Sequence, residues 1–290
     1  MKDKRFYRTF FAMYIVLVFQ NVISLSVNLA DNIMLGAYSE TSLSGVAAVN
    51  QIQFIYQQLL MAAGDGMVIF CSQYWGKKQI GPVKKIAATA MHTGLAFALI
   101  LFLAVSLFPH RAVGLFTTDE AIIAEGVKYL AVIRFTYLFF AVTTILLATL
   151  RSVEIVKIAF YLSVSTLVIN CCINYVLIYG RFGAPQLGVI GAAIGTLAAR
   201  IIECAVAVWY VLKKEPNLKM RISDYFHTDR ILRKDYYKTT LPMLVVQGLW
   251  GLNTAMQTAI LGHMTGPGGG GGGPPPPPPP GSKIKKKKIG

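Results

Sequence analysis

Asp31 is the one charged side chain in an apolar run that begins near Phe10 and ends at Leu35. Placing an ionised carboxylate in hydrocarbon costs on the order of several kcal/mol unless the group is paired, hydrated or protonated. A membrane helix that keeps such a residue typically uses it to bind an ion or to carry a proton. Asp31 is therefore the first candidate for a functional residue.

Three further polar residues, Asn170, Asn174 and Thr196, lie inside apolar runs later in the chain. Asn170 and Asn174 are four residues apart, so on a helix they share one face. Together with Asp31 they would supply a carboxylate, two amide oxygens and a hydroxyl, a set of hard oxygen ligands suited to Na⁺, or a proton relay if Asp31 titrates. The alternative interpretation is that Asn and Thr only hydrogen-bond neighbouring helices, which is common in membranes.

The composition indicates the kind of scaffold that holds these residues. Hydrophobic residues make up 54% of the 290 residues and charged residues only 14%, and mean hydropathy is +0.54. This excludes an ordinary soluble domain and predicts an all-α polytopic membrane protein. The net charge of +15 comes from basic residues between the apolar runs, which indicates membrane topology rather than nucleic-acid binding. No motif of an enzyme active site is present, and the four cysteines lack the spacing of metal ligands or disulfides.

Seven apolar runs are long enough to cross a bilayer core of about 30 Å, which needs roughly 20 helical residues. The predicted spans are 10–35, 46–74, 86–108, 127–150, 158–179, 187–212 and 241–264. Basic residues gather before the first span and after the second, fourth and sixth. By the positive-inside rule, the amino terminus is cytoplasmic, and we expect the chain to lie in the cell membrane in contact with lipid.

This topology places the polar residues at similar depths. The first and fifth spans run outward and the sixth runs inward. A rise of about 1.5 Å per residue puts Asp31 and Asn174 roughly 7 Å below the outer helix ends, and Asn170 and Thr196 roughly 14 Å below them. We therefore expect the four residues to meet.

Three charged residues are weaker candidates for functional residues. Arg200 and Glu203 are three residues apart in the sixth span, a spacing that predicts a local ion pair. Asp65 stands between two glycines, about 29 Å along the second helix, near the expected cytoplasmic interface.

Three motifs, in order along the chain, resemble the multidrug and toxic compound extrusion (MATE) transporter family. They are Ala-Asp-Asn-Ile-Met-Leu-Gly at 30–36, Ser-Gln-Tyr-Trp-Gly at 72–76, and the block from Asn170 to Arg200. The resemblance covers about residues 10–264 and implies cation-coupled antiport through two lobes of six helices. It also implies that Asp31, Asn170, Asn174 and Thr196 match the cation site of the amino-terminal lobe. Some relatives carry a second carboxylate where this chain has Asn174, so both Na⁺ and H⁺ stand as coupling ions.

The expected domains follow from these spans. Residues 1–212 form a six-helix lobe, 213–239 a cytoplasmic linker, and 240–264 a seventh helix that opens a second lobe, whose remainder is missing. Residues 259–262 resemble residues 33–36, consistent with repeated halves. Residues 265–290 are runs of Gly, Pro and Lys, which predict a disordered tail and favour a frameshift or assembly error over a functional segment.

The predicted function is an antiporter that exports amphipathic or cationic small molecules in exchange for Na⁺ or H⁺, without a cofactor. One alternative is a transport-inactive remnant, or a half-transporter that acts with a second lobe or a second copy. The other is a flippase for a lipid-linked precursor on a related scaffold.

Overall fold

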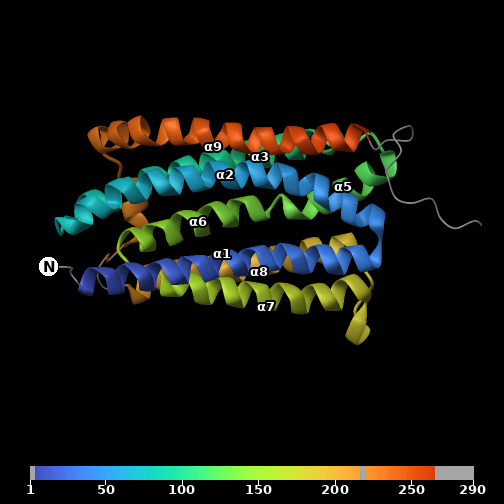
Figure 1. The fold of residues 1–290 in the computed structure, drawn as a ribbon, viewed down its shortest axis with the longest axis horizontal. Coiled ribbons are helices and arrows are strands. Elements are labelled where there is room, and N and C mark those ends of the chain that lie inside the picture. The colour runs from blue at the N-terminus through green and yellow to red at the C-terminus, as the bar shows by residue number, and fades with distance from the viewer. Residues whose placement is uncertain (1–3, 216–217, 219, 265–290) are drawn as a thin grey trace, which may run out of the picture.

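A computed structural model describes residues 4–215, 218 and 220–264, and every regular element in this part of the chain is helical. Figure 1 shows the long helices running side by side along the long axis of the molecule. The elements are α1 (Lys4–Tyr38), α2 (Glu40–Gly76), α3 (Ile80–Leu107), α4 (Pro109–Gly114), α5 (Glu120–Ile133), α6 (Thr136–Ser152), α7 (Lys157–Tyr179), η1 (Arg181–Gly183), α8 (Val189–Trp209), η2 (Tyr210–Lys214), η3 (Ile222–Phe226) and α9 (Arg230–Met264). The predicted all-α fold class is confirmed.

Five helices are long and apolar enough to cross a membrane, namely α1, α2, α3, α7 and α8, the last extended to Lys214 by the π-helical turn η2. They correspond to the predicted first, second, third, fifth and sixth spans. The pair of α5 and α6 makes a sixth span if the two are taken together. The chain is therefore a multi-pass helical membrane protein.

The prediction of one continuous helix over 127–150 is wrong. The chain bends by 55° between α5 and α6, around Arg134 and Phe135. The amides of Phe135 and Tyr137 bond to carbonyls three residues back, each at 3.3 Å, so the backbone tightens there. A short departure from α-helical bonding is a common cause of a kink where no proline is present.

The seventh predicted span lies within α9, which is longer and more polar than expected. The helix begins at Arg230, inside the segment predicted as the linker, and contains Pro242. Its first turns carry several charged residues, and it is not among the helices of the described segment that are apolar enough to span a membrane. The predicted tail, 265–290, lies outside the described residues.

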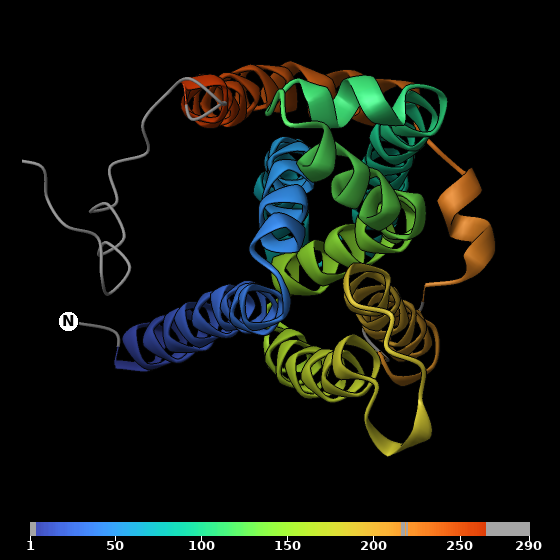
Figure 2. The ribbon, with the colours of Figure 1, turned by 90° about the vertical axis from the view of Figure 1, so that its right-hand side faces the viewer.

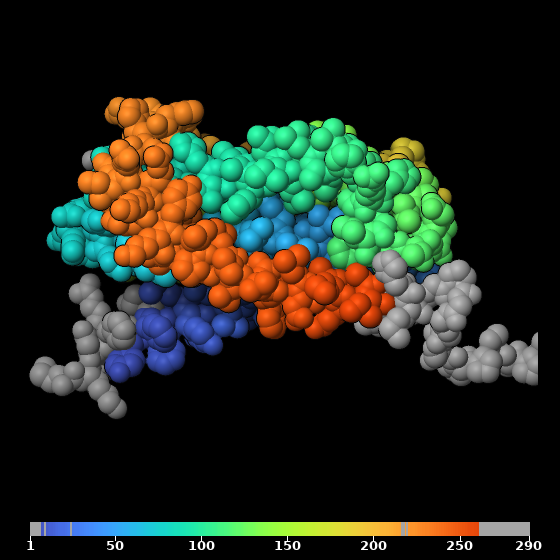
Figure 3. Space-filling model, turned by 90° about the horizontal axis from the view of Figure 1, so that it is seen from above, coloured from blue at the N-terminus to red at the C-terminus, as the bar shows by residue number. Residues whose placement is uncertain are grey.

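Helix packing places α2 at the centre of the bundle. It contacts α3, α5, α6 and α9, whereas α1 packs mainly against α7, which packs against α8. Seen end-on, α9 and α3 lie on one side, α1 and α7 on the other, and α2 and α6 between them (Figure 2). A space-filling view from above shows α2 exposed between α3 and α9 (Figure 3).

Two buried apolar clusters fill the bundle, one toward each end. Each includes a tyrosine whose hydroxyl bonds to a backbone carbonyl of another helix. Tyr56 donates to the Tyr137 carbonyl at 2.7 Å, and Tyr236 donates to the Ala63 carbonyl at 3.0 Å. These bonds satisfy polar groups inside an apolar core, where an unpaired hydroxyl would be costly.

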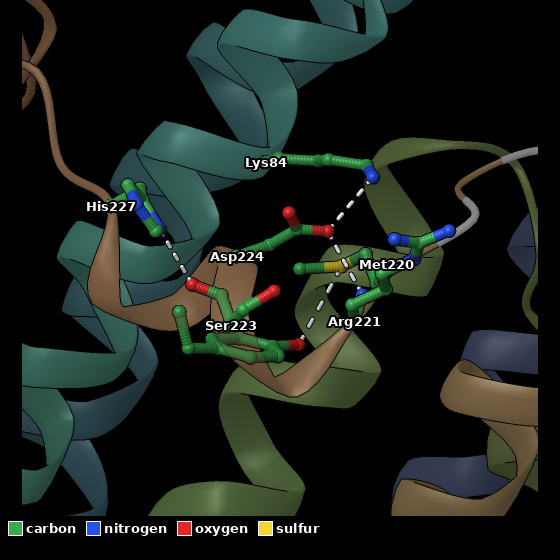
Figure 4. Close-up of polar contacts among 7 residues, drawn as sticks. Lys84, Met220, Arg221, Ser223, Asp224 and His227 are labelled. Carbon is green, nitrogen blue, oxygen red and sulfur yellow. Dashed lines mark hydrogen bonds and ion pairs between the residues drawn. The ribbon is translucent and has the colours of Figure 1, made fainter.

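The short helix η3, in the connection between α8 and α9, docks against α3. Lys84 of α3 forms an ion pair of 2.8 Å with Asp224, which also accepts a bond from the Arg221 amide at 2.8 Å (Figure 4). The same view shows His227 bonded to the Ser223 carbonyl. Desolvation raises the pKa of Asp224, but the bonds from Lys84 and Arg221 and their positive charges outweigh it and hold the pKa below its ordinary value of 3.8.

Candidate functional site

Asp31 of α1 faces α7. Its Oδ1 atom accepts a hydrogen bond of 2.6 Å from Nδ2 of Asn174. Asp31 is half-buried, and Leu35 one turn further along α1 is fully buried, whereas Leu29 and Ile33 on another face of the helix are more than 60% exposed. α1 therefore turns a narrow face, which carries Asp31, toward the rest of the bundle.

A chain of side-chain hydrogen bonds continues from Asp31 across two further helices. Asn174 also donates to Oδ1 of Asn170 at 3.2 Å, and Asn170 donates to Oγ1 of Thr196 on α8 at 3.1 Å. Both asparagines are almost fully buried. The structure thus brings together all four residues that the sequence analysis placed at one depth, and links α1, α7 and α8 through them.

Oδ1, the side-chain amide oxygen of Asn174, is buried and has no hydrogen-bond partner within the described residues. It points at Gly195 of α8, where an added Cβ atom would lie only 2.0 Å from this oxygen. Glycine at 195 therefore makes the space that the Asn174 side chain occupies. An unsatisfied buried oxygen costs about 1–3 kcal/mol, and a bound cation would recover that cost.

The donor set fits a monovalent cation better than a transition metal. It contains one carboxylate, two amide oxygens and a hydroxyl, all hard oxygen donors. In the described part of the chain, no three His, Cys, Asp or Glu residues gather where they could hold a metal ion. With a single negative charge, the site is balanced by one Na⁺ or one proton.

A cavity of about 220 Å³ lies beside this site. It is lined from α1, α2, α6, α7 and α8, and its wall includes Asn28, Thr166 and Arg200. Each of these three residues is one helical turn, roughly 4.5–6 Å, from Asp31, Asn170 or Thr196 respectively. The cation site and the cavity are therefore adjacent on all three helices.

The weaker candidates from the sequence all line this cavity as ion pairs. Arg200 and Glu203 form the predicted local pair, with a distance of 2.7 Å. Asp65 pairs with Arg151 of α6 at 2.5 Å, a partner the sequence analysis did not assign. Both arginines in the wall are thus neutralised by a carboxylate.

A set of amide side chains in the cavity wall was not predicted from the sequence. Gln20, Asn21 and Asn28 come from α1, and Gln53 and Gln57 from α2. Their spacing was a usable signal, because Asn21 and Asn28 are two turns apart and Gln53 and Gln57 one turn apart, so each pair shares a helix face. Hydrogen-bonding groups at these positions would contact any molecule in the cavity.

Comparison with known proteins gives consistent matches. A family model described as MatE matches residues 17–176, more than half of the chain. A probable multidrug resistance protein NorM from Thermotoga maritima is 26% identical over 197 residues, which cover 68% of this chain and 42% of that protein. The uncharacterized transporter YisQ from Bacillus subtilis is 26% identical over 239 residues, covering 81% of this chain and 51% of that protein.

Solved structures match as well. A crystal structure of a MATE protein in its bent conformation superposes with a TM-score of 0.74 at 17% identity, covering 83% of this chain and 53% of that one. At this identity the likeness concerns the fold alone. The chain spans about half the length of the curated relatives it matches.

Proposed function

This chain belongs to the MatE family of membrane transporters, and from that premise we propose that it forms the cation-binding part of a secondary antiporter. The predicted family resemblance is thereby confirmed, and the protein is a transporter rather than an enzyme. We propose that Na⁺ or H⁺ enters the site of Asp31, Asn170, Asn174 and Thr196, while amphipathic or cationic small molecules are exported. Relatives named as multidrug resistance proteins support this class of substrate.

The observation that carries the proposal is the hydrogen-bonded chain from Asp31 to Thr196, together with the unpartnered oxygen of Asn174. A cation bound at Asp31 would take the place of the Nδ2 donor, with the Asn174 side chain turning its oxygen from Gly195 toward the ion, and would then hold α1 against α7. Loss of the cation leaves the Asp31 carboxylate with the Nδ2 group of Asn174 as its donor, so this arrangement of α1 becomes less stable. Cation occupancy thus biases the position of α1.

Antiport follows if cation and substrate favour different arrangements of the same helices. The cavity lies one turn from the site on α1, α7 and α8, so a molecule bound in it contacts the helices that the cation holds together. Each ligand can shift the equilibrium only by its difference in affinity for the two states. If each ligand is to weaken the binding of the other tenfold, the coupling free energy between the two sites must be about 1.4 kcal/mol.

The organisation of the whole protein is also part of the proposal. We place the amino terminus in the cytoplasm, the chain in the cell membrane, and residues 1–212 in one lobe followed by a linker, 213–239, and a seventh helix, 240–264.

A half-transporter that works with a second lobe or copy is the second candidate function. It is favoured by the half-length match and by the large exposed apolar side chains of α9, such as Val246 and Leu249.

The flippase alternative receives less support. A lipid-linked phosphate would need unpaired cationic groups in the cavity. Arg151 and Arg200, the arginines in the wall, are each paired with a carboxylate.

Dye efflux from vesicles tests the proposed function. The 290-residue chain, and the same chain joined to a second lobe from a relative, are reconstituted and loaded with a fluorescent cationic dye. An inward Na⁺ gradient and an inward H⁺ gradient are imposed separately. We expect one gradient to drive efflux, Asp31→Asn to abolish it, and Glu40→Gln, which removes an exposed acid at the start of α2, to leave it unchanged. Gradient-driven efflux at the full rate in Asp31→Asn would refute the assigned site.

A further inference from the structure

The Arg200–Glu203 pair stands at the cavity wall in an environment that suits an organic cation. Glu203 is almost fully buried, with its side chain 6% exposed, and its Oε2 atom lies 2.7 Å from Nη1 of Arg200. The guanidinium carbon of Arg200 lies 4.8 Å from the centre of the Phe140 ring on α6. All three residues line the cavity of about 220 Å³.

We propose that Glu203 and Phe140 form a binding subsite for the cationic group of an exported molecule, and that Arg200 occupies this subsite as a tethered competitor when no such molecule is bound. A buried carboxylate and an aromatic face are the two groups that proteins combine to hold ammonium and guanidinium ligands. The ligand class is therefore an amphipathic organic cation, whose charged group takes the place of the guanidinium. This inference rests on the proposed transport function and assigns the substrate subsite.

Displacement of Arg200 would connect the two binding events. Arg200 follows Thr196 of the cation site by four residues, so both lie on one face of α8, about 6 Å apart along its axis. A guanidinium released from Glu203 keeps its positive charge close to the cation site and disfavours a second cation there. Organic cation and coupling cation then oppose each other, as exchange requires.

The other charged groups of the cavity do not share this arrangement. Asp65 and Arg151 are 38% and 36% exposed, so water already screens their pair. Arg134 has the same stacking chemistry, at 5.2 Å from the Phe135 ring and 5.8 Å from the Phe102 ring, but it does not line the cavity. Arg134 therefore provides a matched control for the loss of a stacked arginine.

Equilibrium binding of ethidium to the 290-residue chain in lipid nanodiscs tests the inference. Arg200→Gln should tighten ethidium binding about tenfold, equivalent to about 1.4 kcal/mol, because the competitor is gone. Glu203→Gln should weaken binding about tenfold, and Phe140→Leu should remove most of the gain when added to Arg200→Gln. Arg134→Gln should change the affinity less than twofold.

Unchanged or weaker ethidium binding in a folded Arg200→Gln variant overturns the inference. If Arg200→Gln does not fold, the Glu203→Gln variant decides the test. An ethidium affinity of Glu203→Gln equal to that of the unmodified chain would also overturn the inference. Binding of ²²Na⁺ measured in parallel reports on the cation site separately. Sodium binding that depends on Asp31, without the ethidium effects, would leave the proposed function standing and refute the Glu203 subsite. The ethidium effects, with neither sodium binding nor proton uptake that depends on Asp31, would support the subsite and refute the cation site.

Discussion

Replacing Gly195 with alanine should damage the cation site although none of its ligands is replaced. The added Cβ atom would lie 2.0 Å from Oδ1 of the Asn174 side chain, whereas two such atoms need at least 3 Å. The Asn174 side chain must therefore move by about 1 Å or more, because the facing α8 backbone is fixed by its helical bonds. A shift of this size lengthens the 2.6 Å bond from Asn174 to Asp31 beyond hydrogen-bonding distance.

The expected cost combines two effects. Loss of a hydrogen bond to a charged group costs about 1.5–3 kcal/mol, and forced overpacking of a tight interior costs about 1–3 kcal/mol. A gain of about 0.5–1 kcal/mol from replacing a helical glycine offsets only part of this. We expect a net loss of about 1.5–5.5 kcal/mol in unfolding free energy and at least a tenfold weaker affinity for the coupling cation.

Denaturant unfolding in detergent micelles and ²²Na⁺ binding in nanodiscs measure the two quantities. Gly248→Ala is the control, since an added Cβ atom there makes an ordinary contact of 3.5 Å with Leu59 on α2. That variant should be as stable as the unmodified chain or slightly more stable. Unfolding free energy and cation affinity in Gly195→Ala equal to those of Gly248→Ala would refute the proposed tight contact between α7 and α8.

Three further predictions concern other bonds of the structure. Tyr56→Phe removes the buried hydroxyl that donates to a carbonyl of α6 at 2.7 Å and should lower the unfolding free energy by about 1–3 kcal/mol, measured by denaturant titration. Thr196→Val removes the acceptor of the bond from Asn170 and should weaken cation binding in a ²²Na⁺ assay severalfold, whereas Thr196→Ser should not. Because the pKa of Asp224 is lowered in the folded protein, its ionised carboxylate stabilises the docking of η3 on α3 fully above pH 3.8. This stabilisation is lost as the pH falls through the pKa of Asp224 in the folded protein. Protease cleavage of this connection should therefore rise below pH 3.8, and Asp224→Asn should be cleaved faster already at pH 7.

The sequence was sufficient for the parts of the fold that depend on the length of the apolar runs. Five predicted spans are observed as apolar helices, because ~20 apolar residues leave a membrane chain few alternatives to a helix. The meeting of Asp31, Asn170, Asn174 and Thr196 also followed from counting turns inward from the predicted helix ends. Such counting works where helices are nearly parallel and their ends are clear.

Features that depend on contacts between distant residues could not be predicted in this way. The bend near Arg134 contains no proline to mark it, and the polar start of α9 resembled a linker in composition. Arg151 as the partner of Asp65 depends on how α6 meets α2, which no local pattern encodes. Gly195 likewise accommodates one particular side chain, that of Asn174, and this contact depends on how α8 packs against α7.

Equilibrium binding of ²²Na⁺ to the 290-residue chain and to Asp31→Asn, both in nanodiscs at pH 7.5, tests the central claim most directly. Titration with acid in the same samples reports competition by protons. We expect the site either to bind sodium saturably and to release it as the pH falls, or, if the coupling ion is H⁺, to take up protons without binding sodium, and we expect Asp31→Asn to lose whichever of these the unmodified chain shows. Sodium binding or proton uptake in Asp31→Asn with the same affinity and stoichiometry as in the unmodified chain would contradict the role of Asp31.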